Sequence, residues 1–112
     1  MAKGDFIGEF ELYVMLAIVQ LGADAYGIRV RQEIDRRTGR EIAIGAVYAT
    51  LGRLLEKDLV GFTVSEPEPV QGGRARKHYR LTPAGARAVR HSTSMLTKMM
   101  AGANLRADGR RP

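Results

Sequence analysis

The chain has 112 residues, which suffices for one domain with a single modest hydrophobic core. Its formal net charge of +6 and its pI of about 10.2 favour an anionic partner such as nucleic acid. The absence of cysteine excludes disulfides and thiol chemistry and is typical of a cytoplasmic protein. The apolar segment from Leu12 to Leu21 is far shorter than the ~20 residues that cross a bilayer. Neither membrane insertion nor export is therefore expected.

The first part of the chain predicts two helices. Residues 1–8 are expected to form a flexible N-terminal arm. The segment from Glu9 to Leu21 is apolar nearly all round, which predicts a helix buried on most of its surface. Asp24 is the expected N-cap of a second helix that runs to about Arg37. The candidate core residues of this second helix are Tyr26, Ile28, Val30 and Ile34.

A third helix is predicted from Ile44 to Lys57, with apolar residues at helical spacing. Its expected buried residues are Ile44, Val47, Tyr48, Leu51, Leu54 and Leu55. The opposite face is small at its N-terminal end, where it carries Gly45, Ala46, Ala49 and Thr50. Gly52 inside this helix costs roughly 1 kcal/mol relative to alanine. A small residue there either lets another backbone or a ligand come close or has arisen by drift, without a specific role.

Two strands and a basic loop follow the third helix. Leu59 to Ser65 alternates apolar and polar residues, and residues 66–69 hold two prolines that cannot continue a central strand. A Gly-Gly turn at residues 72–73 then leads into a second strand from Lys77 to Leu81. The order of helix, strand, basic loop and strand is that of a winged helix. Residues 9–82 are therefore predicted to form a winged-helix DNA-binding domain in a mainly α fold with a small two-stranded β wing.

A fourth helix is predicted from Thr82-Pro83, an N-cap followed by a first-turn proline, to Met100. Residues 83–100 carry an apolar stripe rich in methionine, which favours a C-terminal dimerisation helix. The candidate dimerisation residues are Met95, Leu96, Met99 and Met100. Packing onto the first helix explains the stripe equally well, and a small hydrophobic effector between the two helices is a further alternative. Residues 101–112 are expected to form a disordered basic tail.

The third helix and the wing carry the candidate DNA contacts. Small residues at the start of a helix let its backbone enter a major groove ~12 Å wide. Thr50 could hydrogen-bond a base edge, and the methyl groups of Ala46 and Ala49 could touch thymine. Tyr48 is either a core residue or a phosphate contact. The wing candidates, which would meet the phosphates or the minor groove, are Arg74, Arg76 and Lys77.

The chain lacks the residue combinations that enzymes and metal sites need. Its two histidines, His78 and His91, have no cysteine to complete a zinc set, and His78 is a better candidate for a phosphate contact. Glu9, Glu11 and Glu33 are expected to be surface or capping residues. No catalytic residue, cofactor or metal is predicted.

Several short motifs together resemble the PadR family of transcriptional regulators over roughly residues 8–100. They are Phe10-Glu11-Leu12, Ala25-Tyr26-Gly27, Gly45-Ala46-Val47-Tyr48-Ala49-Thr50-Leu51, Arg53-Leu54, Gly72-Gly73-Arg74-Ala75-Arg76-Lys77 and Tyr79-Arg80-Leu81-Thr82. The resemblance implies a winged helix-turn-helix with a C-terminal dimerisation helix, usually a repressor at an inverted-repeat operator.

Three positions depart from the pattern of that family. Ala43 replaces a serine before the third helix, which removes a cap. Asp58 replaces a glycine at a position expected to need positive φ, and Gly52 stands where an acidic residue is common. The lack of tryptophan means that the aromatic drug-binding pore of some small members cannot be transferred.

The sequence thus predicts a homodimeric, sequence-specific regulator that binds double-stranded DNA and is a repressor. The alternative is a winged-helix module that binds protein or another anion instead of operator DNA. Capture of a specific partner that survives loss of the wing charges would favour this alternative.

Overall fold

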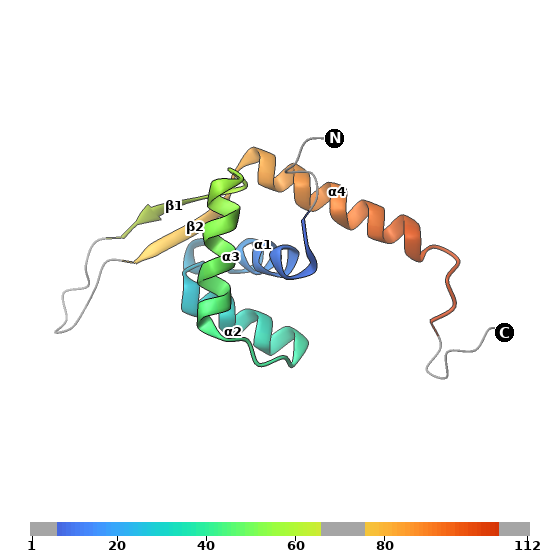
Figure 1. The fold of residues 1–112 in the computed structure, drawn as a ribbon, viewed down its shortest axis with the longest axis horizontal. Coiled ribbons are helices and arrows are strands. Elements are labelled where there is room, and N and C mark those ends of the chain that lie inside the picture. The colour runs from blue at the N-terminus through green and yellow to red at the C-terminus, as the bar shows by residue number, and fades with distance from the viewer. Residues whose placement is uncertain (1–6, 66–75, 106–112) are drawn as a thin grey trace.

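A computed structural model describes residues 7–65 and 76–105 of the chain. Within them, the chain forms four α-helices, a short 3-10 turn and a two-stranded antiparallel sheet that projects at one side of the helices (Figure 1). The predicted mainly helical fold with a two-stranded wing is confirmed. In chain order the elements are α1 (Glu9–Leu21), η2 (Gly22–Asp24), α2 (Gly27–Thr38), α3 (Ile44–Glu56), β1 (Val60–Val64), β2 (Lys77–Leu81) and α4 (Pro83–Met100).

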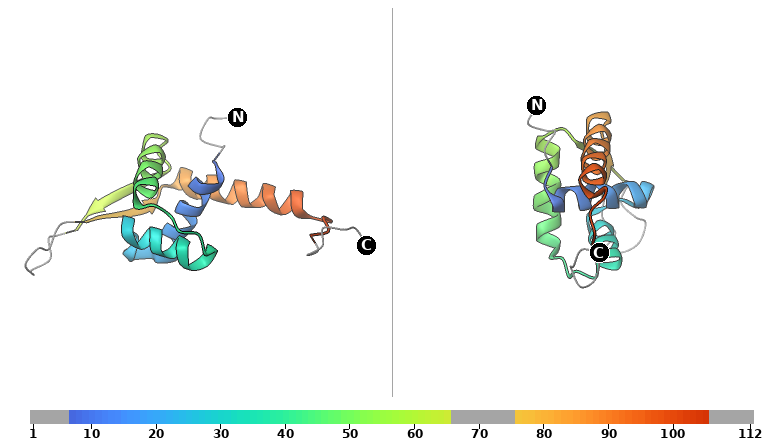
Figure 2. Two further views of the ribbon diagram at one scale, coloured as in Figure 1. Left: turned by 60° about the horizontal axis from the view of Figure 1, so that its bottom comes forward. Right: turned by 90° about the vertical axis from the view of Figure 1, so that its right-hand side faces the viewer.

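Helix α1 is the central element, and it contacts α2, α3, β2 and α4 (Figure 2). Its expected burial is confirmed for most of its surface, although Val19 is 56% exposed. The side chains that α1 places in the core are Val14, Met15, Ala17 and Ile18. Glu11 closes the start of the helix, because its Oε1 accepts the backbone N–H of Gly8 at 2.9 Å.

Helix α2 begins later than the sequence predicts. Asp24 belongs to η2, and the N-cap of α2 is Tyr26, whose backbone is extended. The reason is a long-range hydrogen bond: the N–H of Tyr79 in β2 donates to the carbonyl of Ala25 at 2.7 Å. The carbonyl of Ala25 is used by this bond and not by a helical one, so residues 25–26 stay outside the helix.

The predicted core of α2 is correct in part. Val30 and Ile34 are buried, Tyr26 is half-buried, and Ile28 is 39% exposed. The prediction for Ile28 is wrong because this residue lies off the row that faces α1. Glu33 is also buried instead of lying at the surface, and Arg37 and Arg36 hydrogen-bond its carboxylate. These two hydrogen bonds, Arg37 first, lower the pKa of the Glu33 carboxyl.

Helix α3 starts and ends as the departures from the family pattern predict. Ala43 is the N-cap and makes no side-chain cap hydrogen bond. Asp58 has a φ of 61°, which confirms the expected positive φ. The N–H of Leu59 donates to the carbonyl of Leu54 at 2.9 Å and the N–H of Asp58 to that of Leu55 at 3.0 Å. This pair of bonds is a Schellman motif, a common end of a helix.

The two strands pair in the register Val60↔Leu81, Phe62↔Tyr79 and Val64↔Lys77. The first and last residues of both strands lie within one residue of their predicted positions. The residues between them that the sequence assigns to the wing loop, including Arg74, lie outside the described residues. The outer edge of β2 is hydrogen-bonded to Ala25, so the sheet is attached to the segment before α2.

Helix α4 starts where the sequence predicts. The hydroxyl of Thr82 accepts the N–H of Gly85 at 3.0 Å, donates to the carbonyl of Asp58 at 2.8 Å, and precedes a proline at the first helical position. The first half of the helix packs on the core through Ala88 and Val89. Its second half extends away from the other helices, on the side opposite to the wing (Figure 1). Of the predicted tail, residues 106–112 lie outside the described residues.

Candidate nucleic-acid interface

The exposed face of α3 is made of very small side chains at its N-terminal end. Gly45, Ala46 and Ala49 are all exposed. A Cβ atom added at Gly45 or Gly52 would have no atom within 4 Å beyond its own helix backbone. The backbone of α3 is therefore open to close approach from outside along this face. Small side chains of this kind allow a helix to enter the major groove of DNA.

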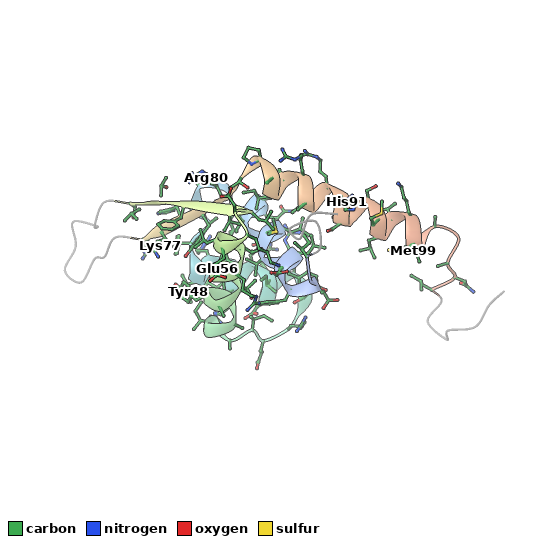
Figure 3. The ribbon with its side chains drawn as sticks, turned by 45° about the horizontal axis from the view of Figure 1, so that its top comes forward. Tyr48, Glu56, Lys77, Arg80, His91 and Met99 are labelled. Atoms are coloured by element: carbon green, nitrogen blue, oxygen red, sulfur yellow. The ribbon has the colours of Figure 1, made fainter. Side chains whose placement is uncertain are left out.

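Tyr48 lies at the edge of this face instead of in the core. Its side chain is 52% exposed, and Figure 3 shows it on the same side of the molecule as Lys77 of β2. The ring packs over Gly27 at the start of α2, because a Cβ atom at Gly27 would lie 2.5 Å from it. Glycine at residue 27 thus creates the space for the tyrosine. The prediction of Tyr48 as a core residue is therefore wrong, and its contact with a phosphate stays a prediction.

Thr50 does not lie on the exposed face, and this prediction is wrong. The residue is 1% exposed, and its Oγ1 accepts a hydrogen bond from Arg53 Nη2 at 2.9 Å. Thr50 follows Val47 by three residues and precedes Leu54 by four, so it falls on the buried row of the helix. Its hydroxyl is therefore not available to a DNA base, and Arg53 is the exposed polar group at this point of α3.

The basic side chains of the wing lie on aromatic rings. The guanidinium carbon of Arg76 is 4.5 Å from the centre of the Tyr26 ring, and Lys77 Nζ is 4.6 Å from the centre of the Phe62 ring. Both basic residues are exposed. Cation–π contacts of this kind help to hold a charged group in place. Arg74, the third wing candidate, lies outside the described residues.

His78 is held at the base of the wing. Its ring Nδ1 lies 2.9 Å from the carbonyl oxygen of Ala23, to which an Nδ1–H donates, and its ring meets Tyr26 edge-on at 5.6 Å. Tyr26 is thus the common contact of His78 and Arg76. The sequence did not indicate this role of Tyr26, although the alternation of β2 places residues 76 and 78 on one face of the strand.

Tyr79 is a structural residue beneath this surface. It is 5% exposed and packs against Phe62 with the ring centres 5.9 Å apart. Burial, with a smaller contribution from nearby Tyr48, raises the pKa of the Tyr79 hydroxyl. The hydroxyl therefore remains neutral at physiological pH and adds no charge to the interface.

A second surface lies at the far end of the molecule, along α4. The predicted dimerisation residues are exposed there: Met95 by 39%, Leu96 by 54%, Met99 by 80% and Met100 by 48%. An apolar groove of about 480 Å³ runs between this part of α4 and the start of α1. The residues that line the groove include Ile7, Leu12, Tyr13, Met95, Leu96 and Met99. We call it the α1–α4 groove.

The arrangement of α2, α3 and the two strands defines a winged helix-turn-helix. Residues 15–91 match the Transcriptional regulator PadR-like family. The chain is 40% identical over 88 residues to Transcriptional regulator Rv3488 of Mycobacterium tuberculosis, across 77% of this chain and 78% of that protein. It therefore belongs to the PadR-like family, as the sequence motifs indicated, and it is a transcriptional regulator and not an enzyme.

Solved structures share the fold. A PadR family transcription regulator from Clostridium difficile R20291 superposes with a TM-score of 0.68 and 23% identity, covering 84% of this chain and 96% of that one. A PadR family transcriptional regulator from Eggerthella lenta DSM 2243 gives a TM-score of 0.64 and 26% identity, covering 83% of this chain and 82% of that one. Among residues 7–65 and 76–105, no helix is long and apolar enough to span a membrane.

Sequence reasoning missed residues whose role depends on distant contacts. Gly85 lies against the backbone of Leu59, and a Cβ atom there would be 1.9 Å from the Leu59 carbonyl oxygen. Glu11 is buried and meets Lys57 from the end of α3 at 2.9 Å. A glycine in the first turn of a predicted helix was the available signal for Gly85. For Glu11, periodicity alone gave no signal, because the partner is far away in the chain.

Proposed function

We propose that the protein binds an inverted-repeat operator as a homodimer and represses transcription. The observation that carries this proposal is the exposed small face of α3 beside the basic residues of β2. In this proposal α3 is the recognition helix, and Ala46 and Ala49 contact base edges in the major groove. Tyr48 contacts a phosphate at the border of the groove.

The wing supplies affinity through phosphates. Arg76 and Lys77 are exposed, and stacking on Tyr26 and Phe62 presents their charges in fixed positions. Held charges lose less side-chain entropy on binding, so they are suited to phosphate contacts. Arg74 is proposed to extend the same contacts. Because phosphates are common to all sequences, the wing sets affinity and register while α3 sets sequence preference.

Dimerisation is proposed to occur through the exposed end of α4. Met99 is 80% exposed, and it lies with Met95, Leu96 and Met100 on a helix that extends beyond the packed domain (Figure 3). A contiguous apolar surface of this kind is typical of an interface between chains. In a two-fold dimer, two recognition helices would face the two halves of a palindromic site.

A small hydrophobic effector is proposed to bind in the α1–α4 groove and release the operator. The groove has a volume of about 480 Å³ and a mostly apolar lining, with His91 and Ser92 as polar groups at its wall. These properties are typical of small-molecule sites. The protein is expected to act in the cytoplasm, where its operator is.

The salt dependence of binding to the DNA upstream of its own gene tests this function. Fluorescence anisotropy should show tighter binding to this DNA than to a scrambled duplex, by a factor of about a thousand or more. Arg76→Ala and Lys77→Ala should each lower the magnitude of the salt slope by about 2 for a dimer, because each removes two phosphate contacts. Both variants should keep the sequence preference.

Lys98→Ala is the matched control for these variants, since it removes one charge from an exposed position near the far end of α4. Its salt slope should stay within experimental error of the unaltered protein. Equal affinity for the upstream and scrambled duplexes would contradict operator recognition. Equal slopes for Arg76→Ala, Lys77→Ala and Lys98→Ala would remove the wing from the phosphate contacts.

A further inference from the structure

Glu11 is a buried carboxylate that two separate parts of the molecule share. Its Oε1 accepts the N–H of Gly8 at 2.9 Å, and its Oε2 accepts a hydrogen bond from Lys57 Nζ at 2.9 Å. The residue is 8% exposed, and Lys57 follows it by 46 residues in the chain. One side chain thus joins the start of α1 to the C-terminal end of α3.

A second basic residue of α3 approaches the same carboxylate. Arg53 Nε lies 3.9 Å from Glu11 Oε2, and Arg53 Nη2 donates to Thr50. Burial alone would raise the pKa of the Glu11 carboxyl. The hydrogen bonds from Lys57 and Gly8 and the charges of Lys57 and Arg53 together outweigh burial, so the pKa is lowered. The carboxylate is therefore ionised at neutral pH and faces cations on successive turns of α3.

The other side chains that α3 buries in the core are mainly apolar. Val47, Leu51 and Leu54 are fully or almost fully buried in the core. Apolar contacts depend on the area buried and have little directional preference. Charge-assisted hydrogen bonds have preferred geometry, so the bond from Glu11 to Lys57 restricts the rotation of α3 about its axis. That rotation decides which side chains α3 presents to DNA.

The other oxygen of Glu11 connects to the α1–α4 groove. Gly8, whose N–H it accepts, follows Ile7, and Ile7 lines the groove together with Leu12. Leu12 itself follows Glu11 in α1. The Glu11 carboxylate thus contacts both Lys57 at the end of α3 and the backbone next to the groove.

We propose that Glu11 is a positioning residue for operator recognition. It holds α3 in the orientation that reads DNA, and it ties this orientation to the start of α1 beside the groove. The inference rests on the proposed function, because it assigns a role in the discrimination of operator from other DNA. Glu11 does not contact DNA in this account, so its effect must appear in sequence discrimination and not in phosphate contacts.

The test compares Glu11→Gln with Glu9→Gln in the full-length protein. Both variants remove one negative charge from the first turn of α1, but Glu9 is exposed and pairs only loosely with Arg40 at 3.6 Å. The measured quantity is the ratio of affinities for the upstream duplex and for a scrambled duplex of equal length. We expect Glu11→Gln to lower this ratio about tenfold, within the range of coupling between linked sites, and Glu9→Gln to leave it unchanged.

A second variant and a stability control separate positioning from loss of folding. Lys57→Met should lower the ratio similarly, and combining it with Glu11→Gln should add little, because both remove one contact. If the Glu11→Gln protein does not fold, the Lys57→Met variant alone tests the proposal. Ile18→Val weakens the core within α1 but leaves the carboxylate in place, so it should leave the ratio unchanged.

The outcomes distinguish this inference from the proposed function. If the unaltered protein does not discriminate the upstream duplex, the proposed function fails and the inference fails with it. If it discriminates but Glu11→Gln behaves like Glu9→Gln, only the role of Glu11 is overturned. If Ile18→Val lowers the affinity ratio as much as Glu11→Gln does, the effect is a general one of stability, and the role of Glu11 is again overturned.

Discussion

Asp58 has a backbone conformation that suits glycine. Its φ of 61° lies in the left-handed region, and the Schellman motif at the end of α3 requires this conformation. A residue with a side chain pays about 1–2 kcal/mol in this region, although aspartate tolerates it better than most. The position lies between α3 and β1, so the strain is located where the helix joins the wing.

Replacement of Asp58 by glycine should therefore stabilise the protein. We expect Asp58→Gly to raise the free energy of unfolding by ~1 kcal/mol, measured by chemical denaturation monitored by circular dichroism. Glu56→Gly is the control, since it places a glycine in the last turn of α3, where it should be destabilising by up to ~1 kcal/mol. An Asp58→Gly protein that is no more stable than the unaltered chain would show that the backbone at Asp58 is not strained.

For single residues, local backbone geometry was predicted better than side-chain burial. The missing cap at Ala43 and the positive φ at Asp58 were both expected from the departures from the family pattern, and both concern local backbone geometry. The roles of Tyr48 and Thr50 were not distinguished. Hydrophobicity places tyrosine in the core, whereas the space over Gly27 gives Tyr48 a half-exposed site. The small, weakly polar side chain of Thr50 fits the buried row once Arg53 satisfies its hydroxyl.

At the scale of elements, the helix ends that depend on local caps were predicted well. The start of α4 at Thr82-Pro83 and the ends of α1 and α3 lie within one residue of their predicted positions. The start of α2 was predicted too early in the chain, because a hydrogen bond from Tyr79 determines where this helix begins. The two strands were predictable from their alternation, but the contact of β2 with Ala25 and the aromatic contacts of Arg76 and Lys77 depend on tertiary structure.

Two glycines within helices are expected to respond in opposite ways to alanine. At Gly85, a Cβ atom would lie 1.9 Å from the Leu59 carbonyl oxygen, so α4 and the backbone before β1 would have to move apart. We expect Gly85→Ala to be destabilising by roughly 3 kcal/mol, as in other overpacked sites. At Gly52 an added Cβ atom would meet no atom within 4 Å beyond its chain neighbours and its own helix backbone, so Gly52→Ala should be stabilising by ~1 kcal/mol through helix propensity.

Denaturation curves for the two alanine variants, recorded under identical conditions, test the close approach of α4. The pair is informative because the chemical change is the same and only the surroundings differ. A Gly85→Ala protein as stable as Gly52→Ala would show that α4 does not approach Leu59 closely.

At the scale of the whole molecule, the two proposed functional surfaces lie at opposite ends. The wing and Tyr48 lie at one end, and the exposed methionines of α4 lie at the other (Figures 1 and 3). A dimer formed through α4 would therefore leave both recognition helices free to bind DNA. The separation of a methionine-rich helix from the helix and strands of the proposed DNA-binding surface was predictable from the order of the elements.

Selection of binding sites from random DNA duplexes tests the central claim most directly. The full-length protein should enrich an inverted repeat whose half-site centres are separated by about one helical turn, 34–36 Å, or a multiple of it. A variant with Leu96→Glu and Met99→Glu, in which the exposed end of α4 carries new charges, should lose the repeat and enrich at most a half-site. Enrichment of no sequence by the unaltered protein, or of a single unrepeated site, would contradict a dimeric reader built on α3.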